Sequence, residues 1–578
     1  MRTILFASLT LLATVALGAA QDSAAAGDAG RITPVQGRDG MVVAQERAAA
    51  EVGAAILREG GNAVDAAVAV ACALAVTYPQ AGNLGGGGFM VVHMAEAGQS
   101  FALDFREMAP GAATRDMFLD EDGNPDAALS RRSILSAGTP GSVAGLAFAR
   151  DQWGTLPLAR LVEPALRMAE DGITVSAPLS SSLESARGGL HRSPAAMEAF
   201  FGQDGRDGQA PAPGSTLRQP DLAWSLRAIA ESGHDAFYRG AVGAKIVAFM
   251  QEAGGLITDA DLEAYQPVLR DPVAGGYRGT EVVSMPPPSA GGTLLVQMLG
   301  ILGRHDVAAL GHGSPSQIHL FAEVMKRAYA DRAQYFGDPD FVDVPVARLL
   351  SDAHLEALGA SISPDAATPA ESLGDASLRP AGESTETTHF SVIDSHGNAV
   401  ACTTTLNFSY GSRIMVPGTG ILLNNEMDDF AAKPGSPNAF GALGGEANAV
   451  APRKRMLSSM TPTIVLKDGK PWMVTGAPGG TRITTAVLQA ITNTLDFGMD
   501  AAGAIEAPRI HHQWYPDTLF LEEGISPESM AALRALGHEI GSRSAIGRVQ
   551  TAAWDGTGTF SGYSDPRSPG GAAVPVSP

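Results

Sequence analysis

The chain has 578 residues, of which 45% are hydrophobic and 17% charged, so it is long and apolar enough for a large core or for two closely packed lobes. A formal net charge of −21 argues against nucleic-acid binding, because phosphates would be repelled. Two cysteines, Cys72 and Cys402, are too few to staple an exported protein with disulfides, and we expect two separate buried thiols.

The first residues have the pattern of a cleavable secretory signal peptide, residues 1–20. Arg2 is followed by an apolar run at residues 4–17 and then by small residues. After this segment no apolar run reaches the roughly 18 residues that a membrane-spanning helix needs. We therefore expect export to a bacterial periplasm, or secretion, with no membrane attachment after signal cleavage.

The N-terminal half begins with two predicted helices, residues 48–57 and 63–76, and a glycine-rich loop, residues 83–88. This loop precedes a strand and lacks a Gly-Lys-Ser/Thr ending, which argues against a nucleotide site. A further strand, residues 101–106, ends at Arg106, whose guanidinium can bind a carboxylate through two parallel N–H donors. For an arbitrary arginine, a surface salt bridge would be the ordinary interpretation.

From residue 142 to about residue 350 the pattern is mostly helical. Amphipathic stretches recur there and are interpreted as packing layers without chemistry. They lie at residues 158–169, 222–230, 241–252, 294–302 and 316–329.

The junction at Thr387 is the most informative stretch of the chain. Residues 361–385 are rich in Pro, Ala, Ser, Gly and Asp and lack hydrophobic periodicity, whereas apolar and polar residues alternate after Thr387. A cut before Thr387 would combine a hydroxyl nucleophile and an α-amino base, of pKa roughly 7.7 to 8.0, in one residue. The alternative is that Thr387 and Thr388 only begin a β-strand.

After the junction, residues 388–394 and 398–406 are predicted to form a β-hairpin. His389 is interpreted as structural, on the side of the strand opposite to the nucleophile. His511 and His512 are adjacent, so they point in different directions on any regular element, and no further ligand follows at metal spacing. No metal site is therefore expected.

Longer motifs follow one another in a fixed order: DFREMAP at residues 104–110, MPPPSAGG at 285–292, TTHFSVID at 387–394, GILLNNEMDDF at 420–430, LSSMTPT at 457–463 and GAPGG at 476–480. Together they resemble the γ-glutamyltranspeptidase (glutathione hydrolase) family of the N-terminal nucleophile hydrolase superfamily, over about residues 33–568. The resemblance implies an α/β (α+β) fold, a four-layer αββα sandwich. It also implies a precursor that cuts itself between Glu386 and Thr387. The products would be a large subunit, residues 21–386 with a flexible tail at 361–386, and a small subunit, residues 387–578, which together form one compact catalytic unit.

The resemblance also implies roles for individual residues. Thr387 would be the nucleophile, and Thr405 would hydrogen-bond to its hydroxyl. Gly479 and Gly480 would form the oxyanion hole, a role that consecutive residues without side chains suit because their backbone N–H groups are accessible. The γ-glutamyl group would be bound at its α-carboxylate by Arg106, Ser458 and Ser459 and at its α-amino group by Asn407, Glu426 and Asp429. An alternative for Asp428 and Asp429 is that they cap the following turn.

Residues 431–446 resemble the lid loop of many bacterial family members, with Phe440 where those members often have Tyr. In the implied reaction, Thr387 attacks the γ-amide of glutathione or of a glutamine-like donor. It then passes the γ-glutamyl group to water or to the amine of an amino acid or dipeptide, without a cofactor. Two rivals stay open: a cephalosporin (glutaryl-7-ACA) acylase-like amidase on the same fold, and a non-catalytic binding protein that remains a single chain. The lid and Asp429 favour γ-glutamyl over glutaryl substrates.

Overall fold

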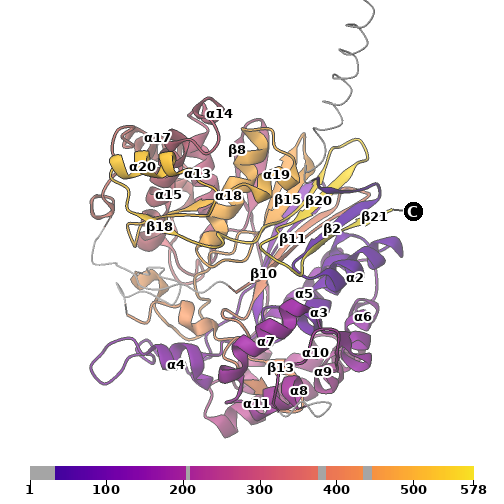
Figure 1. The fold of residues 1–578 in the computed structure, drawn as a ribbon. Coiled ribbons are helices and arrows are strands. Elements are labelled where there is room, and N and C mark those ends of the chain that lie inside the picture. Colours follow the sequence, from indigo (N-terminus) through magenta and orange to yellow (C-terminus); the bar gives the residue numbers. More distant parts are fainter. Residues whose placement is uncertain (1–32, 203–207, 375–385, 434–444, 578) are drawn as a thin grey trace, which may run out of the picture.

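The computed structural model describes residues 33–202, 208–374, 386–433 and 445–577 (Figure 1). Three parts of the sequence analysis lie outside these residues: the signal peptide at 1–20, residues 375–385 of the predicted tail, and the part of the lid that contains Phe440. The centre of the structure consists of two seven-stranded sheets that pack face to face.

The first sheet has the strand order β1, β20, β19, β15, β14, β9, β8, in which every neighbouring pair is antiparallel. Its strands come from the beginning, the middle and the C-terminal part of the chain, so the sheet forms only when distant segments meet. They are β1 (Val35–Gly37), β8 (Val273–Tyr277), β9 (Thr280–Ser284), β14 (Thr463–Lys467), β15 (Lys470–Gly476), β19 (Gln550–Trp554) and β20 (Phe560–Ser564).

The second sheet has the order β21, β2, β10, β11, β3, β4, β7 and is also antiparallel. The predicted hairpin forms its centre, as β10 and β11. The strands are β2 (Gly40–Ala44), β3 (Gly87–Met94), β4 (Gln99–Phe105), β7 (Val268–Arg270), β10 (Thr388–Asp394), β11 (Ala399–Thr405) and β21 (Ala572–Val576).

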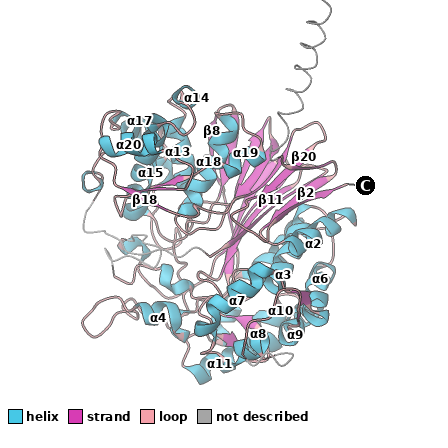
Figure 2. Cartoon of the chain, in the orientation of Figure 1, coloured by secondary structure: helices cyan, strands magenta, loops and turns pink. Residues whose placement is uncertain are grey.

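Helices cover the outer face of each sheet, as Figure 2 shows. The first sheet is covered by α13 (Gly291–Leu302), α15 (Pro315–Tyr335), α18 (Arg482–Leu495) and α19 (Ala501–Glu506). The second is covered by α2 (Arg47–Arg58), α3 (Ala63–Thr77) and α5 (Ser142–Trp153), with α6 (Leu158–Asp171) and α9 (Pro220–Ser232) behind them. The predicted four-layer αββα sandwich is therefore confirmed.

The remaining elements are short or peripheral. The helices are α4 (Ala127–Arg132), α7 (Ala177–Leu190), α8 (Pro194–Phe201), α10 (Asp235–Tyr238), α11 (Ala241–Ala253), α12 (Asp259–Ala264), α14 (Val307–Leu310), α16 (Val346–Leu349), α17 (Asp352–Ala360) and α20 (Pro527–Ala535), and the 3-10 turns are η1 (Ile134–Ser136), η2 (Ala370–Ser372), η3 (Glu426–Asp429) and η4 (Glu446–Asn448). The strands are β5 (Ile173–Thr174), β6 (Thr216–Leu217), β12 (Met415–Val416), β13 (Ile421–Leu422), β16 (Ile510–His511), β17 (Leu519–Leu521) and β18 (Ile540–Ser542).

Strand alternation divides the core into two apolar clusters. Along β10, Phe390 and Val392 pack toward α3, whereas Ile393 packs between the two sheets. Because both faces are covered, every residue of β10 and β11 is buried. Cys72 and Cys402 are free and buried, as predicted, and burial raises the pKa of Cys72 to about 12.

His389 corrects one prediction from the sequence. The β10–β11 register pairs His389 with Thr403 and Thr388 with Thr404, so Thr387 and His389 share one face and the predicted opposite orientation was wrong. The ring lies between the sheets, where Nδ1 is 2.8 Å from the Thr403 hydroxyl. Burial lowers its pKa to about 3, so it stays neutral and structural.

Candidate active site

Thr387 lies directly before β10 and is buried. Its hydroxyl is 3.5 Å from the hydroxyl of Thr405, at the end of the partner strand. The Thr405 hydroxyl in turn donates to the carbonyl oxygen of Glu386 at 3.4 Å and accepts from the backbone N–H of Asn407 at 2.8 Å. The strand register therefore brings the predicted nucleophile, its partner and the predicted cleavage carbonyl together.

The glycine pair occupies the turn between β15 and α18. Gly479 has φ 145° and Gly480 φ 60°, and the first of these values is open only to glycine. Arg482 fixes the turn, because its Nε donates to the carbonyl of Gly479 at 3.2 Å. Gly480 lines the cavity described below and lies just before the N-terminus of α18. The partial positive charge of a helix N-terminus adds to the stabilisation of an oxyanion by backbone N–H donors.

Arg106 follows β4, is fully buried, and binds two carboxylates. Its Nη1 donates to Glu426, and its Nη2 donates to Asp429 at 2.5 Å. Burial alone would lower the pKa of Arg106, but these carboxylates raise it, so the guanidinium stays charged. Burial raises the pKa of Asp429 to about 6 and also raises that of Glu426, against the opposing effect of Arg106. Asp428, in contrast, accepts from the hydroxyl of Ser130 at 2.5 Å.

Glu107 is a buried carboxyl that the sequence analysis did not single out. Its Oε2 lies 3.7 Å from Nη1 of Arg106, and neither of its oxygens has a hydrogen-bond partner among the described residues. Burial raises its pKa to about 7. The only sequence signal for Glu107 is its position beside Arg106 in the DFREMAP motif.

Hydrogen bonds to backbone groups hold Asn407 and Ser458, two further predicted substrate ligands. Asn407 has φ 75°, and its Nδ2 donates to the carbonyl of Asn425 at 3.0 Å. Ser458 donates its N–H to the carbonyl of Pro288 at 2.9 Å and accepts the N–H of Ala290 at 2.9 Å. This pairing explains why the MPPPSAGG motif accompanies the LSSMTPT motif, since the first holds the second in place.

One cavity of about 370 Å³ collects most of these groups, although neither Gly479 nor Glu107 is among the residues that line it. Arg332 of α15 and Thr481 also line it and were missed, because neither belongs to a recognisable motif. Of the predicted site residues, the cavity is lined by Arg106, Thr387, Thr405, Asn407, Glu426, Asp429, Ser458, Ser459 and Gly480.

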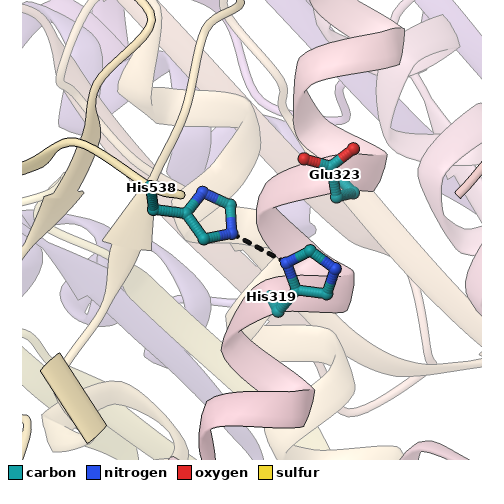
Figure 3. Close-up of side chains that lie close together, drawn as sticks. All are labelled: His319, Glu323 and His538. Carbon is teal, nitrogen blue, oxygen red and sulfur yellow. Dashed lines mark hydrogen bonds between the residues drawn. The ribbon is translucent and has the colours of Figure 1, made fainter. Parts of the chain in front are cut away.

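Three buried side chains of metal-ligating type lie outside this cavity, namely His319 and Glu323 of α15 and His538 (Figure 3). His319 Nε2 donates to the carbonyl of Ser363 at 2.7 Å, so its Nδ1 must accept from Nε2 of His538, also at 2.7 Å. Glu323 accepts the N–H of Thr368 at 3.0 Å. The cluster thus ties part of the predicted tail to α15 and to the C-terminal part of the chain.

A hydroxyl at the start of a central strand, backbone donors beside it and two stacked sheets between helix layers define an N-terminal nucleophile hydrolase. Residues 49–575 match the family model described as Gamma-glutamyltranspeptidase. The chain therefore belongs to the γ-glutamyltranspeptidase family.

Individual relatives agree with this membership. The chain is 50% identical over 535 residues to a glutathione hydrolase proenzyme of Escherichia coli (strain K12), and the match covers 93% of this chain and 91% of that protein. It is 42% identical over 576 residues to a glutathione hydrolase proenzyme of Pseudomonas aeruginosa, with 99% of each covered. A cephalosporin acylase from Bacillus halodurans has the same fold, with a TM-score of 0.82, 28% identity, and 94% and 97% of the two chains covered. Among the described residues, no helix is both long and apolar enough to cross a membrane.

Proposed function

We propose that this enzyme hydrolyses and transfers γ-glutamyl groups, with Thr387 as the nucleophile. The Thr387 hydroxyl attacks the γ-amide carbon of glutathione or of a glutamine-like donor, and its own α-amine accepts and returns the proton. The N–H groups of Gly479 and Gly480 stabilise the oxyanion. The resulting γ-glutamyl ester passes to water or to the amine of an amino acid or dipeptide.

The nucleophile is released by self-cleavage. In the uncut chain the Thr387 hydroxyl attacks the carbonyl of Glu386, which Thr405 polarises, and the peptide bond shifts to an ester that water then opens. The products are a large subunit, residues 21–386, and a small subunit, residues 387–578. Glu386 becomes the C-terminus of the large subunit, at the end of the predicted tail, residues 361–386.

The observation that most favours a γ-glutamyl substrate is the pairing of Arg106 with Asp429 and Glu426. A γ-glutamyl group ends in an ammonium and a carboxylate on one carbon. Its carboxylate binds the guanidinium of Arg106 and accepts hydrogen bonds from the hydroxyls of Ser458 and Ser459. Its ammonium binds the carboxylates of Glu426 and Asp429 and donates to the amide oxygen of Asn407. The buried ions exchange partners and none is left unpaired, which keeps the cost of desolvation low.

A cephalosporin acylase-like amidase is the alternative. A glutaryl group lacks the ammonium, so it would leave Glu426 and Asp429 with only the arginine to neutralise them. Rates on γ-glutamyl and glutaryl p-nitroanilides compare the two functions directly. A higher kcat/KM for the glutaryl anilide would favour the acylase.

The first experiment is the intact mass of the purified protein, compared with Thr387→Ala and with Thr388→Val as a matched control. Thr388 is the neighbouring buried threonine, and its hydroxyl has no hydrogen-bond partner among the described residues. We expect the wild type and the control to yield two chains, the second beginning at Thr387, while Thr387→Ala stays whole. A folded wild type that remains a single chain would instead support a binding protein.

The same mass gives the first residue of the large chain. We propose export through the signal peptide, residues 1–20, to the periplasm, and a large chain that begins near Gln21 supports this. We further propose that the segment containing Phe440 covers the bound donor as a lid.

A further inference from the structure

A second cavity, with about 1080 Å³ of empty space, adjoins the first at the predicted cleavage site. Glu386 lines this second cavity, whereas Thr387 lines the first. Its walls come from the ends of α2 and α3, from α7, and from the segments around Arg548 and Arg567. Two consecutive residues, Glu386 and Thr387, therefore line different cavities.

The second cavity is rich in cations. Arg413, Arg548 and Arg567 line it, against the carboxylates of Glu46 and Glu386. Arg567 is paired with Glu522 at 2.5 Å, outside the cavity lining. Arg548 lies 3.8 Å from the carboxylate of Glu386. If Glu386 leaves with the large-subunit tail after the cut, this cavity loses a carboxylate and keeps its arginines.

Arg548 is coupled to the oxyanion turn through its neighbour. Gly547 packs so closely on Gly479 that a Cβ added at Gly479 would lie 3.2 Å from the Gly547 Cα. On its other side, the carbonyl of Arg548 accepts from Nε2 of Gln550, the first residue of β19. The backbone thus holds Arg548 at a fixed place behind the oxyanion turn, and its side chain is 26% exposed.

We propose that the second cavity binds the leaving peptide and the incoming acceptor, with Arg548 binding the carboxylate of an amino acid or short peptide. This inference rests on the proposed function. The acyl carbon on Thr387 carries the glutamyl chain, which fills the first cavity. The nitrogen that leaves or arrives must lie on the side of that carbon away from the glutamyl chain, and we assign that side to the second cavity because Glu386, the residue before Thr387, lines it. Before the cut, the side chain of Glu386 occupies the place of the acceptor carboxylate.

The transfer step balances without any further reactant. The acceptor's neutral amine forms a C–N bond to the acyl carbon, the ester C–O bond to Thr387 breaks, and the amine proton passes through the Thr387 α-amine to Oγ. Water entering the same cavity gives glutamate instead. Occupancy of the second cavity therefore sets the ratio of transfer to hydrolysis.

The test compares Arg548→Ala and Arg548→Lys with the wild type and with Arg304→Ala, which removes an exposed arginine paired with Asp352. The donor is γ-glutamyl p-nitroanilide and the acceptor glycylglycine. We expect the acceptor KM of Arg548→Ala to rise roughly tenfold or more, as for loss of a charged hydrogen bond, with a matching fall in the ratio of transfer to hydrolysis. Arg548→Lys should recover part of the loss, and Arg304→Ala should match the wild type. An unchanged acceptor KM in Arg548→Ala overturns the proposal.

A second measurement avoids mutation, because a change at Arg548 could also slow self-cleavage. With the wild type, glycylglycine is compared with its C-terminal amide, which keeps the amine and lacks the carboxylate. We expect a roughly tenfold higher KM for the amide. Equal KM values overturn the proposal. Hydrolysis of the donor without acceptor is measured throughout, and its absence from the cleaved wild type would count against the proposed function rather than against the acceptor site.

Discussion

The hydroxyl of Thr405 stands between the hydroxyl of Thr387, at 3.5 Å, and the carbonyl oxygen of Glu386, at 3.4 Å. The backbone N–H of Asn407 fixes it there at 2.8 Å. One hydroxyl thus contacts both the attacking oxygen and the carbonyl that we propose it attacks. Removing it should affect self-cleavage before it affects anything else.

We predict that Thr405→Val slows self-cleavage at least roughly tenfold, since the polarising donor is lost while shape and volume are nearly kept. Thr405→Ser keeps the hydroxyl and should cleave at a rate close to that of the wild type. The two chains are quantified on denaturing gels at intervals after refolding of the precursor. Equal rates for Val and Ser would mean that Thr405 only packs beside the nucleophile.

Arg106→Lys should lower kcat/KM for the donor by roughly thirtyfold or more, because lysine keeps the charge but cannot donate two parallel hydrogen bonds. Arg106→Ala should also destabilise the fold by about 3–5 kcal/mol, since it leaves two buried carboxylates without their cation. Steady-state kinetics measures the first effect, and urea unfolding of the uncut single chain, in a Thr387→Ala background, measures the second. Arg115→Lys, at an exposed pair with Glu446, is the control and should change neither quantity appreciably.

Gly479→Ala should lower kcat by roughly a hundredfold or more, the usual effect of losing an oxyanion donor. The reason is geometric, because alanine cannot adopt φ 145°. The turn must therefore move, and its N–H groups no longer point at the oxyanion. Gly359→Ala on α17 is the control, because its Cβ would meet only Ile301, at 3.6 Å. A normal kcat in Gly479→Ala would place the oxyanion donors elsewhere.

The pH dependence of kcat/KM should steepen at low pH. Protonation of the Thr387 amine lowers the rate by about tenfold per pH unit below the pKa of that amine, and the unperturbed pKa of an α-amino group is roughly 7.7 to 8.0. Asp429 must be ionised to bind the donor's ammonium, and burial raises its pKa to about 6. The Asp429 side chain is therefore charged above about pH 6, and its negative charge is lost as the pH falls below that value. The slope of log kcat/KM against pH should change from one toward two near pH 6, and a constant slope would contradict this role.

Local patterns in the sequence were enough to predict the hairpin, the helix layers and the position of Thr387. Alternation after residue 387 and helical spacing elsewhere report directly on strands, helices and burial. The face of the strand on which His389 lies could have been derived from the same alternation rule, but the prediction from the sequence was wrong. The family resemblance then predicted nine of the residues that line the first cavity.

Contacts between distant elements could not be predicted in this way. Arg332 reaches the cavity only because α15 packs on α13 and its Tyr329 donates to the carbonyl of Thr481, and no pattern on α15 marks Arg332. The pairing of His319 with His538 likewise depends on how the C-terminal part folds back. The raised pKa of Glu107 can be inferred only once its burial beside Arg106 and Asp429 is known.

The strand order of the second sheet affects how the enzyme can refold after it has been cut. β10 and β11 lie after the proposed cut, yet they are inserted between β2 and β3, which lie before it, and β21 pairs on the other side of β2. Such interleaving forms readily while one covalent chain limits the search. Two separated chains would have to meet and thread at a rate that depends on their concentration. The mature enzyme should therefore persist through slow unfolding rather than reversible equilibrium, and a heated sample should not regain activity on cooling.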